Sequence, residues 1–199
     1  MSLDFEKFKA LIFDLDGTLI DSMAVHNLTW IETLGHFGLD ISVKDLGDLA
    51  GISSLRTVEI LNHKFKTNLD PVQVTNTKEN LYLKRVKDVK IAVEVFDLVK
   101  KYFGKLPLAI VTGGERKVVS HVLSELSLER FFQVVTCADD TKEGKETPTP
   151  FLFTSDKLKV DPRECLFFDD GDVGLKGARQ SGMQVVRVNL FATPIFSLT

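Results

Sequence analysis

Short runs of consecutive apolar residues recur along the chain, and polar or glycine-containing segments separate them. Continuous apolar runs of four to six residues are typical of strands in a parallel sheet that is covered on both faces. We therefore predict five buried parallel strands. They cover residues 10–13, 106–111, 132–136, 165–168 and 184–188.

Helical patterns lie between most of these runs. Apolar residues recur at helical spacing over residues 93–103, 116–126 and 173–181, and Gly182 supplies a helix-stop signal after the last of these. Alternation of strands and helices in this way is the sequence pattern of a doubly wound α/β fold. The fold class predicted is therefore α/β, with a Rossmann-like, doubly wound parallel sheet.

The segment between residues 22 and 88 departs from this pattern, because it follows the first strand but contains no convincing strand of its own. Trp30 and Leu34 are spaced for one helix, and residues 55–65 and 72–86 carry the pattern of two more. The sequence therefore predicts an inserted all-helical cap domain over residues 22–88. Residues 1–21 and 89–199 would form the core domain.

The composition is ordinary for a globular protein, and it mainly argues against certain classes of binding partner. The chain has 199 residues, enough for one core and a small accessory domain, and its formal net charge is -3. That charge argues against broad binding to nucleic acid or anionic membrane. The apolar stretches are too short to span a bilayer, and residues 1–9 lack the pattern of a signal peptide. Cys137 and Cys165 show no metal spacing, as expected of buried thiols in a reducing cytoplasm.

Polar side chains follow three of the predicted strands. Asp14 and Asp16 follow the first strand, Thr112 follows the second, and Asp169 and Asp170 follow the fourth. The carboxyl ends of parallel strands meet at one edge of a sheet, where ligands bind. Four carboxylates brought together there would repel one another unless a cation lay among them. The hard, oxygen-liganded cation that works with phosphate is Mg²⁺, so we predict a magnesium site.

The segment from Asp14 to Thr18 carries the sharpest chemical signal. A carboxylate such as Asp14 can act as a nucleophile and form an aspartyl phosphate. A second acid two residues later, Asp16, can protonate a leaving alcohol and then activate water. Gly17 allows the tight backbone turn that exposes amide groups toward an anion.

These segments resemble the motifs of the haloacid dehalogenase-like hydrolase superfamily, whose members are mostly phosphatases. The first motif corresponds to residues 13–19, the second to residues 110–113 and the fourth to residues 167–172. The resemblance spans nearly the whole chain, including the helical insertion, which is similar to the family's cap. It is strongest to the β-phosphoglucomutase-like phosphatases, including small sugar-phosphate phosphatases.

The family's third motif is a lysine, usually in Gly-Lys-Pro-x-Pro. The corresponding run is residues 144–148, where Lys145 matches the lysine and Glu146 replaces the first proline. Lys142 is the alternative lysine. The resemblance implies that Lys145 neutralises Asp14 and the phosphoryl oxygens.

The resemblance also implies a role for each matched residue of the first two motifs. Asp14 would be the nucleophile and a metal ligand. Asp16 would be the general acid and base, and its backbone carbonyl would bind the metal. Thr112 would hydrogen-bond the transferring phosphoryl group, with the backbone N–H groups of Gly113 and Gly114 nearby.

The fourth motif and the cap complete the expected site. Asp170 would bind Mg²⁺ directly, and Asp169 would bind it directly or through water, with Asp172 farther out. In the cap, His26 is expected to contact the acid/base residue, and Arg56 to contact the distal end of the substrate. Residues 21–22 and 86–89 would be two hinge strands, and cap closure would exclude water.

The function expected is that of a monomeric, cytoplasmic, magnesium-dependent phosphatase acting on a small phosphorylated metabolite, a sugar phosphate. A β-phosphoglucomutase shares all the motifs, so the sequence leaves that alternative open. A true haloacid dehalogenase needs no metal and lacks an acid at the position of Asp16. A receiver-like or catalytically silent module is disfavoured, because receivers carry their acid pair before the phosphorylated aspartate and lack a large insertion.

Overall fold

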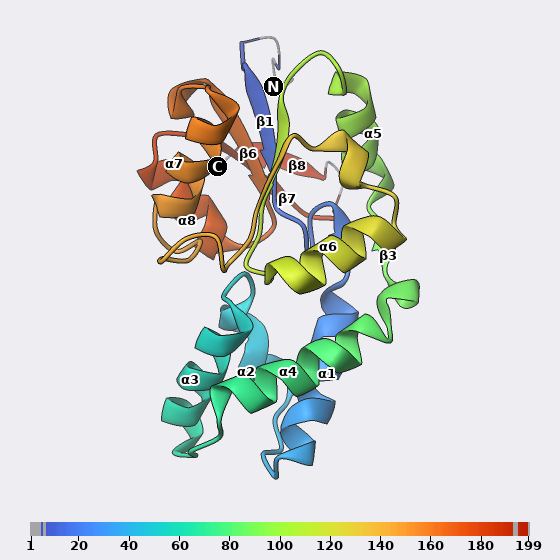
Figure 1. Cartoon of the computed structure of the whole chain (residues 1–199), viewed down its shortest axis with the longest axis vertical. Helices are drawn as coiled ribbons and strands as arrows, with labels where there is room; N and C mark the ends of the chain where they lie inside the picture. Colours follow the sequence, from blue (N-terminus) through green and yellow to red (C-terminus); the bar gives the residue numbers. More distant parts are fainter. Residues whose placement is uncertain (1–4, 6, 193–194, 199) are drawn as a thin grey trace.

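The centre of the molecule is a six-stranded sheet (Figure 1). The computed structural model describes residue 5, residues 7–192 and residues 195–198. The strands are β1 (Ala10–Phe13), β4 (Leu108–Val111), β5 (Val134–Thr136), β6 (Cys165–Asp169), β7 (Gln184–Val188) and β8 (Phe196–Leu198). Their order is β5-β4-β1-β6-β7-β8, in which the first five are parallel and β8 is antiparallel to β7.

All five predicted strands are present, and the α/β fold class is confirmed. β4 and β5 each begin two residues later than predicted. Pro107 precedes β4 and has no N–H group to donate, and the short 3-10 helix η3 (Glu129–Phe131) precedes β5. The edge strand β8 was not predicted.

Two pairs of helices cover the two faces of the sheet. The helices are α5 (Val93–Tyr102), α6 (Arg116–Glu125), α7 (Thr149–Leu158) and α8 (Asp172–Gln180). Alternate strand residues point to opposite faces. Leu11 and Phe13 of β1 pack in one cluster with α5 and α6, whereas Ala10 and Ile12 pack in another with α7 and α8. No helix in the described part of the chain is long and apolar enough to cross a membrane.

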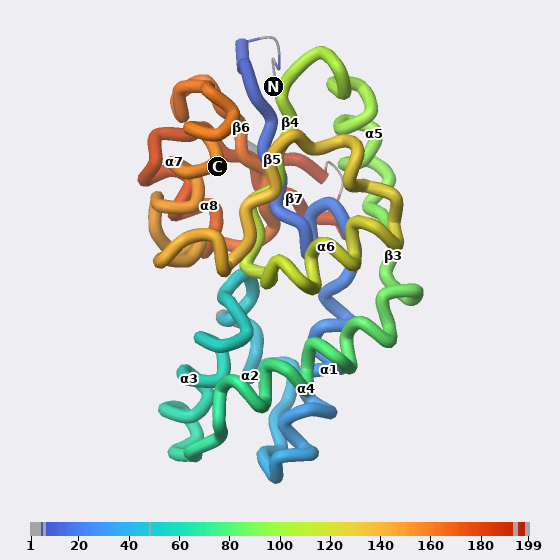
Figure 2. Tube along the Cα trace, viewed as in Figure 1, coloured from blue at the N-terminus to red at the C-terminus, as the bar shows by residue number. Residues whose placement is uncertain are grey.

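Four further helices follow β1 and lie together at the end of the sheet to which β1 runs (Figures 1 and 2). They are α1 (Met23–His36), α2 (Val43–Leu46), α3 (Ser54–Phe65) and α4 (Pro71–Leu83). They share a separate apolar cluster around Trp30, Leu34 and Leu61. The helical character predicted for this segment is therefore present, while the cap-domain limits at residues 22 and 88 stay a prediction.

Two short strands connect the helical segment to the rest of the chain. β2 (Ile20–Asp21) pairs antiparallel with β3 (Lys90–Ile91). The predicted positions of the hinge strands, residues 21–22 and 86–89, are wrong by one or more residues. Ser22 is the N-cap of α1, and its carbonyl accepts a bond from His26 N. The short 3-10 helix η2 (Val86–Asp88) occupies the second position.

Candidate active site

Three strands place polar side chains at the end of the sheet where the parallel strands terminate. Asp14 follows β1, Thr112 follows β4, and Asp169 ends β6. Because β1 pairs with β4 on one side and β6 on the other, these residues meet at the middle of the sheet. Asp14 and Asp169 are buried, and together with Asp170 they bring one carboxylate oxygen each within 4.8 Å of one another.

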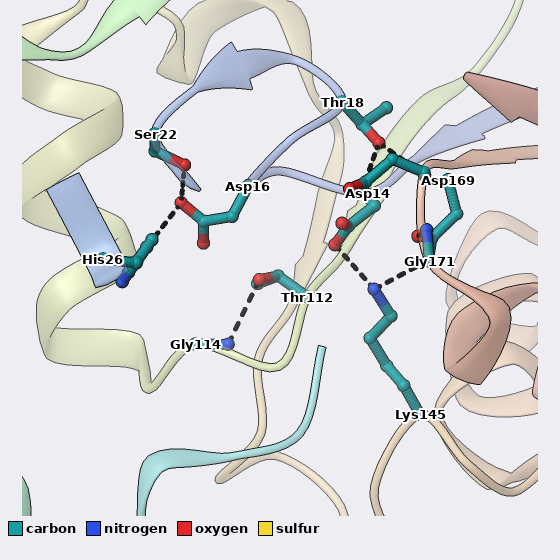
Figure 3. Close-up of polar contacts among 11 residues, drawn as sticks. Asp14, Asp16, Thr18, Ser22, His26, Thr112, Gly114, Lys145, Asp169 and Gly171 are labelled. Atoms are coloured by element: carbon teal, nitrogen blue, oxygen red, sulfur yellow. Dashed lines mark hydrogen bonds and ion pairs between the residues drawn. The ribbon is translucent and has the colours of Figure 1, made fainter. Parts of the chain in front are cut away.

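Lys145 reaches this cluster from the loop between β5 and α7 (Figure 3). Its Nζ atom lies 2.7 Å from Asp14 Oδ1 and 2.8 Å from Asp169 Oδ2. The Lys145 side chain is only 2% exposed. Lys142, the alternative lysine, lies exposed on the same loop. Of the two, Lys145 is therefore the lysine that lies among the carboxylates.

Glycines of α8 make this approach possible. A Cβ atom on Gly174 would overlap Asp169 Oδ2 and lie 2.7 Å from Lys145 Cε. A Cβ atom on Gly177 would overlap the Lys145 carbonyl oxygen. Any larger residue at these positions would push the lysine away from the carboxylates, so the small residues of α8 help to shape the site.

One lysine charge faces three carboxylates. Burial acts to lower the pKa of Lys145, but the charges of Asp14 and Asp169 outweigh burial and raise that pKa above its ordinary value. Burial raises the pKa of Asp14, and Lys145 opposes this effect. Burial and the charge of Asp169 raise the pKa of Asp170 to about 6. The cluster is thus short of positive charge, and a cation would relieve the repulsion.

The donor atoms fit a hard divalent cation. Asp169 Oδ2 is buried and, apart from its ion pair with Lys145, has no hydrogen-bond partner among the described residues. Gly17 has φ +83°, and a Cβ atom there would lie 2.5 Å from Asp170 Oδ2, so the glycine leaves room beside that carboxylate. Oxygen donors of this kind suit Mg²⁺. Asp16, whose backbone carbonyl was predicted as a further ligand, lines the same cavity.

Asp16 faces the helical segment rather than the carboxylate cluster (Figure 3). Its Oδ1 atom accepts hydrogen bonds from Ser22 Oγ at 2.6 Å and from Tyr82 Oη at 3.4 Å, and lies 2.9 Å from His26 Nε2. Burial acts to raise the pKa of Asp16. The His26 ring, the Ser22 hydroxyl and the Lys78 ammonium together hold that pKa below its ordinary range.

His26 links Asp16 to a lysine that the sequence did not reveal. Lys78 Nζ lies 3.0 Å from His26 Nδ1, and the His26 ring stacks on Tyr82 with centroids 4.1 Å apart. Burial and the charge of Lys78 lower the pKa of His26, while Asp16 opposes them. Because an ammonium only donates, neutral His26 accepts at Nδ1 and donates from Nε2 to Asp16.

A cavity of about 610 Å³ connects the carboxylate cluster to the helical segment. Thr112 lies at its wall, and its Oγ1 atom accepts a bond from Gly114 N at 3.1 Å. A Cβ atom on Gly113 would overlap the Gly51 carbonyl oxygen, so the loop after β4 touches the loop before α3. The lining from the sheet edge includes Asp14, Asp16, Thr112, Gly113, Gly114, Asp169 and Asp170. The lining from the helices includes His26, Asn27, Trp30, Thr57 and Lys78.

One residue singled out from the sequence lies outside this cavity lining. Arg56 is not part of the cavity lining, and its exposed guanidinium pairs with Glu59 one turn along α3. The structure therefore does not bring Arg56 together with the other candidate residues. Asp172 does line the cavity, where it begins α8 with its carboxylate 90% exposed and paired with Arg187.

The chain belongs to the haloacid dehalogenase-like hydrolase family, whose family model matches residues 11–188. The predicted enzyme class, a phosphatase of this family, is confirmed. The fructose-1-phosphate phosphatase YqaB of Escherichia coli is 32% identical over 186 residues, which cover 94% of this chain and 99% of that protein. The phosphoglycolate phosphatase of Aquifex aeolicus is 29% identical over 181 residues, which cover 87% of this chain and 81% of that protein.

Solved structures share the fold at lower identity. CbbY from Rhodobacter sphaeroides in complex with phosphate superposes with a TM-score of 0.81 at 18% identity, covering 92% of this chain and 86% of that chain. The β-phosphoglucomutase of Clostridium difficile superposes with a TM-score of 0.79 at 24% identity, covering 92% of this chain and 85% of that chain. At these identities the likeness establishes the fold alone.

The sequence contains a pattern from which the inward position of Lys78 could have been predicted. Val74, Lys78 and Tyr82 recur at four-residue spacing along α4, and all three are buried. A lysine within an otherwise apolar helical stripe must find a partner, because burying an unpaired charge is costly. That pattern marks Lys78 as a residue turned inward, although it does not identify His26 as its partner.

Proposed function

We propose that this protein is a magnesium-dependent phosphatase that hydrolyses a small sugar phosphate through an aspartyl phosphate on Asp14. The observation that carries this proposal is the placement of the buried Lys145 between Asp14 and Asp169, two residues that line the same cavity as Asp16. A nucleophile that is paired with a buried cation thus faces the same space as a proton carrier. Phosphoryl transfer requires positioning and charge neutralisation of this kind.

In the first step, an Asp14 carboxylate oxygen attacks the phosphorus atom, and the bond from phosphorus to the sugar oxygen breaks. Asp16 gives its proton to that leaving oxygen, which departs as an alcohol. Asp16 is ionised in the free enzyme, but a phosphoryl group bound beside it adds negative charge and raises its pKa. Lys145 and the Thr112 hydroxyl offset the charge on the phosphoryl oxygens.

In the second step, Asp16 takes a proton from a water molecule, whose oxygen attacks the phosphorus atom. The bond from phosphorus to Asp14 breaks, inorganic phosphate leaves, and Asp14 is again a carboxylate. His26 and Ser22 hold the Asp16 carboxylate in place during both proton transfers. Trp30 covers this side of the cavity with apolar surface, and Tyr82 is buried against the His26 ring.

Asp14, Asp169, Asp170 and the backbone carbonyl of Asp16 would hold the magnesium ion. When bound, Mg²⁺ supplies positive charge to the phosphoryl oxygens and to the carboxylate cluster. Lys145 then keeps Asp14 from being repelled by the phosphoryl group it attacks. The shortage of positive charge in the cluster supports this assignment.

A sugar phosphate suits the lining of the cavity. Asn27 and Thr57 offer hydrogen-bonding groups, and Trp30 offers an aromatic surface, on the side away from the carboxylates. The relative with 32% identity is named as a fructose-1-phosphate phosphatase, so we propose fructose 1-phosphate as the first substrate to test. Cytoplasmic location and a monomeric state remain part of the proposal.

The phosphomutase alternative would require a second anion site, because a mutase must bind a sugar bisphosphate at both ends. Arg56 was the candidate for that distal site, but its guanidinium pairs with Glu59 outside the cavity lining. The basic residues that line the cavity, among those described, are Lys78 and Arg187, and both are already held by other groups. A monophosphate ester is therefore the better match.

Phosphate release tests the proposal. Purified protein would be offered fructose 1-phosphate, other sugar phosphates, phosphoglycolate and nucleoside monophosphates, with Mg²⁺ and with EDTA. We expect Mg²⁺-dependent release from a sugar monophosphate and none from Asp14→Asn. If no compound yields phosphate, but β-glucose 1-phosphate becomes glucose 6-phosphate once a bisphosphate is added, the mutase is the correct function.

A further inference from the structure

Arg187 lies beside the carboxylate cluster but has no part in the function proposed above. It belongs to β7 and stands opposite Asp169 at the last rung between β6 and β7. Its side chain is 31% exposed and lines the active-site cavity. Because the ladder between the two strands ends at Asp169, the Asp170 carbonyl beyond it has no strand partner.

The guanidinium of Arg187 supplies that partner. Arg187 donates from Nη1 to the Asp170 carbonyl at 2.7 Å. On the other side, Asp170 N donates to Thr18 Oγ1 at 3.1 Å, and Thr18 Oγ1 donates back to Asp170 Oδ1 at 3.4 Å. Both backbone groups of Asp170 are thus fixed from outside its own turn, one by the first motif and one by β7.

A second hydrogen bond links Arg187 to the far side of the turn. Its Nη2 donates to Asp172 Oδ1, two residues after Asp170. Between these two anchors lies Gly171, whose N–H donates to Asp169 Oδ1 at 2.7 Å. The guanidinium fork therefore bridges the turn between β6 and α8, and a charged fork makes stronger and more directional bonds than a neutral group does.

There is space for Asp170 to leave its position. A second cavity of about 250 Å³ is lined by Asp170, Arg187, Asn189 and Phe191 on the side of β7. Without the arginine fork, the turn around Gly171 could swing, and the Asp170 carboxylate could turn into that space and away from Asp14. The fork opposes this movement.

We propose that Arg187 is a positioning residue that holds the turn from Asp170 to Asp172 so that the Asp170 carboxylate faces the metal. This inference rests on the proposed function, because it concerns the affinity of that metal site. Groups that orient metal ligands from outside are known to set metal affinity, typically by about 10-fold to 100-fold. Arg187 acts through Asp170 and does not contact the reacting atoms.

Magnesium binding measured by calorimetry, without substrate, tests the inference. We expect Arg187→Gln to raise the Kd for Mg²⁺ by about tenfold. Arg187→Lys is expected to give a smaller rise, because an ammonium cannot hold both partners in a fork. At saturating Mg²⁺, Arg187→Gln should retain the KM for the sugar phosphate. The matched control is Arg163→Gln, which removes an exposed arginine paired with Asp161 and should leave Mg²⁺ binding unchanged.

A second variant removes the other anchor. Asp172→Ala is expected to weaken Mg²⁺ binding less than Arg187→Gln does, and the double variant should bind no more weakly than Arg187→Gln alone. Thermal melting in EDTA identifies a variant that has merely lost its fold. If Arg187→Gln is such a variant, the Kd values for Mg²⁺ of Arg187→Lys and Asp172→Ala test the inference in its place. An unchanged Kd in these variants, or a raised KM with an unchanged Kd, would overturn the inference. A wild-type protein that takes up no Mg²⁺ would overturn the proposed metal site itself.

Discussion

Lys78 lies in a buried, largely aromatic environment, although its ammonium group prefers water. It is 5% exposed, and its ammonium lies over the rings of Trp30 and Tyr82 at 5.4 and 5.2 Å from their centroids. Burial lowers the pKa of Lys78 to about 8. Burying a charged ammonium is costly unless the group has a hydrogen-bond partner. Here the partner is the His26 imidazole that donates to Asp16.

Lys78→Met removes this charge while keeping most of the side-chain volume. His26 then loses the donor at Nδ1 and is free to take the tautomer that cannot donate to Asp16. We expect kcat for the sugar phosphate to fall by about 10-fold to 100-fold, because proton transfer by a positioned group contributes about 100-fold to 10,000-fold and the variant weakens the positioning without removing Asp16. The measurement is steady-state kinetics with saturating Mg²⁺.

The control for this variant is Lys84→Met, which changes an exposed lysine at the end of the same helix. Its kinetic constants should match those of the wild type. Equal kcat values for Lys78→Met and wild type would show that His26 needs no support from the lysine.

Gly174 illustrates how a residue without a side chain contributes to the site. Its substitution by alanine places a Cβ atom on top of Asp169 Oδ2. We expect Gly174→Ala to lower the free energy of unfolding by about 3 kcal/mol, as overpacking of a rigid site does, and to abolish phosphate release. Denaturant unfolding and the phosphatase assay measure the two effects.

Gly35→Ala is the matched control, because Gly35 is also helical and a Cβ atom there would come no closer than 3.9 Å to another residue. It should stabilise the fold by about 0.5 to 1 kcal/mol through helix propensity. A Gly174→Ala variant that is as stable and active as Gly35→Ala contradicts the close packing of α8 against the cluster.

At the scale of elements, the contact between α4 and α6 brings two acidic residues together. Glu79 of α4 is 7% exposed, and Glu115 is the N-cap residue of α6. Burial, with the added charge of Glu115, raises the pKa of Glu79 to about 7 against an ordinary value of 4.5. Lys78 and Lys117 oppose this rise.

The raised pKa predicts how stability depends on pH. Between pH 4.5 and about 7 the folded chain holds a proton on Glu79 that the unfolded chain does not, so stability falls as pH rises through this window. Glu79→Gln stays neutral and should be more stable than the wild type by about 2 kcal/mol at pH 8, with little difference at pH 5. Unfolding curves across this range test the difference.

Glu94→Gln, at an exposed position in the first turn of α5, is the control and should follow the pH dependence of the wild type. If wild type and Glu79→Gln keep a constant stability difference from pH 5 to pH 8, Glu79 does not titrate in this window.

The elements that could be predicted from the sequence are those whose own residues carry a complete hydrophobic pattern. β1 and β4 are fully apolar, and β6 is apolar up to Asp169, so the residues of these strands themselves indicate burial on both faces of the sheet. α7 was not predicted, because it buries Thr154 and Ser155 as well as Phe151, which hides the apolar stripe. β8 is a three-residue edge strand, and its pairing with β7 depends on tertiary packing rather than local pattern.

At the scale of the whole molecule, the topology explains which site residues could be predicted. Asp14, Thr112 and Asp169 follow strands, and adjacent parallel strands bring their ends together. Lys145 required the resemblance to a family motif, because a lysine in a loop has no preferred direction. Lys78, Arg187 and the outward position of Arg56 depend on how helices and strands pack, so the sequence alone did not reveal them.

The central claim is that the phosphoryl group passes through Asp14, and trapping that intermediate tests it most directly. Because Asp16 takes part in both the formation and the breakdown of the intermediate, the wild-type enzyme is used, and brief mixing with sugar phosphate radiolabelled at phosphorus and with Mg²⁺ should leave a labelled phosphoryl group on it. After acid quench within the first turnover and proteolysis, the account predicts label on the peptide that contains Asp14, and none in Asp14→Asn. Label on a different residue, or no labelled enzyme from a substrate that the wild type hydrolyses, would contradict it.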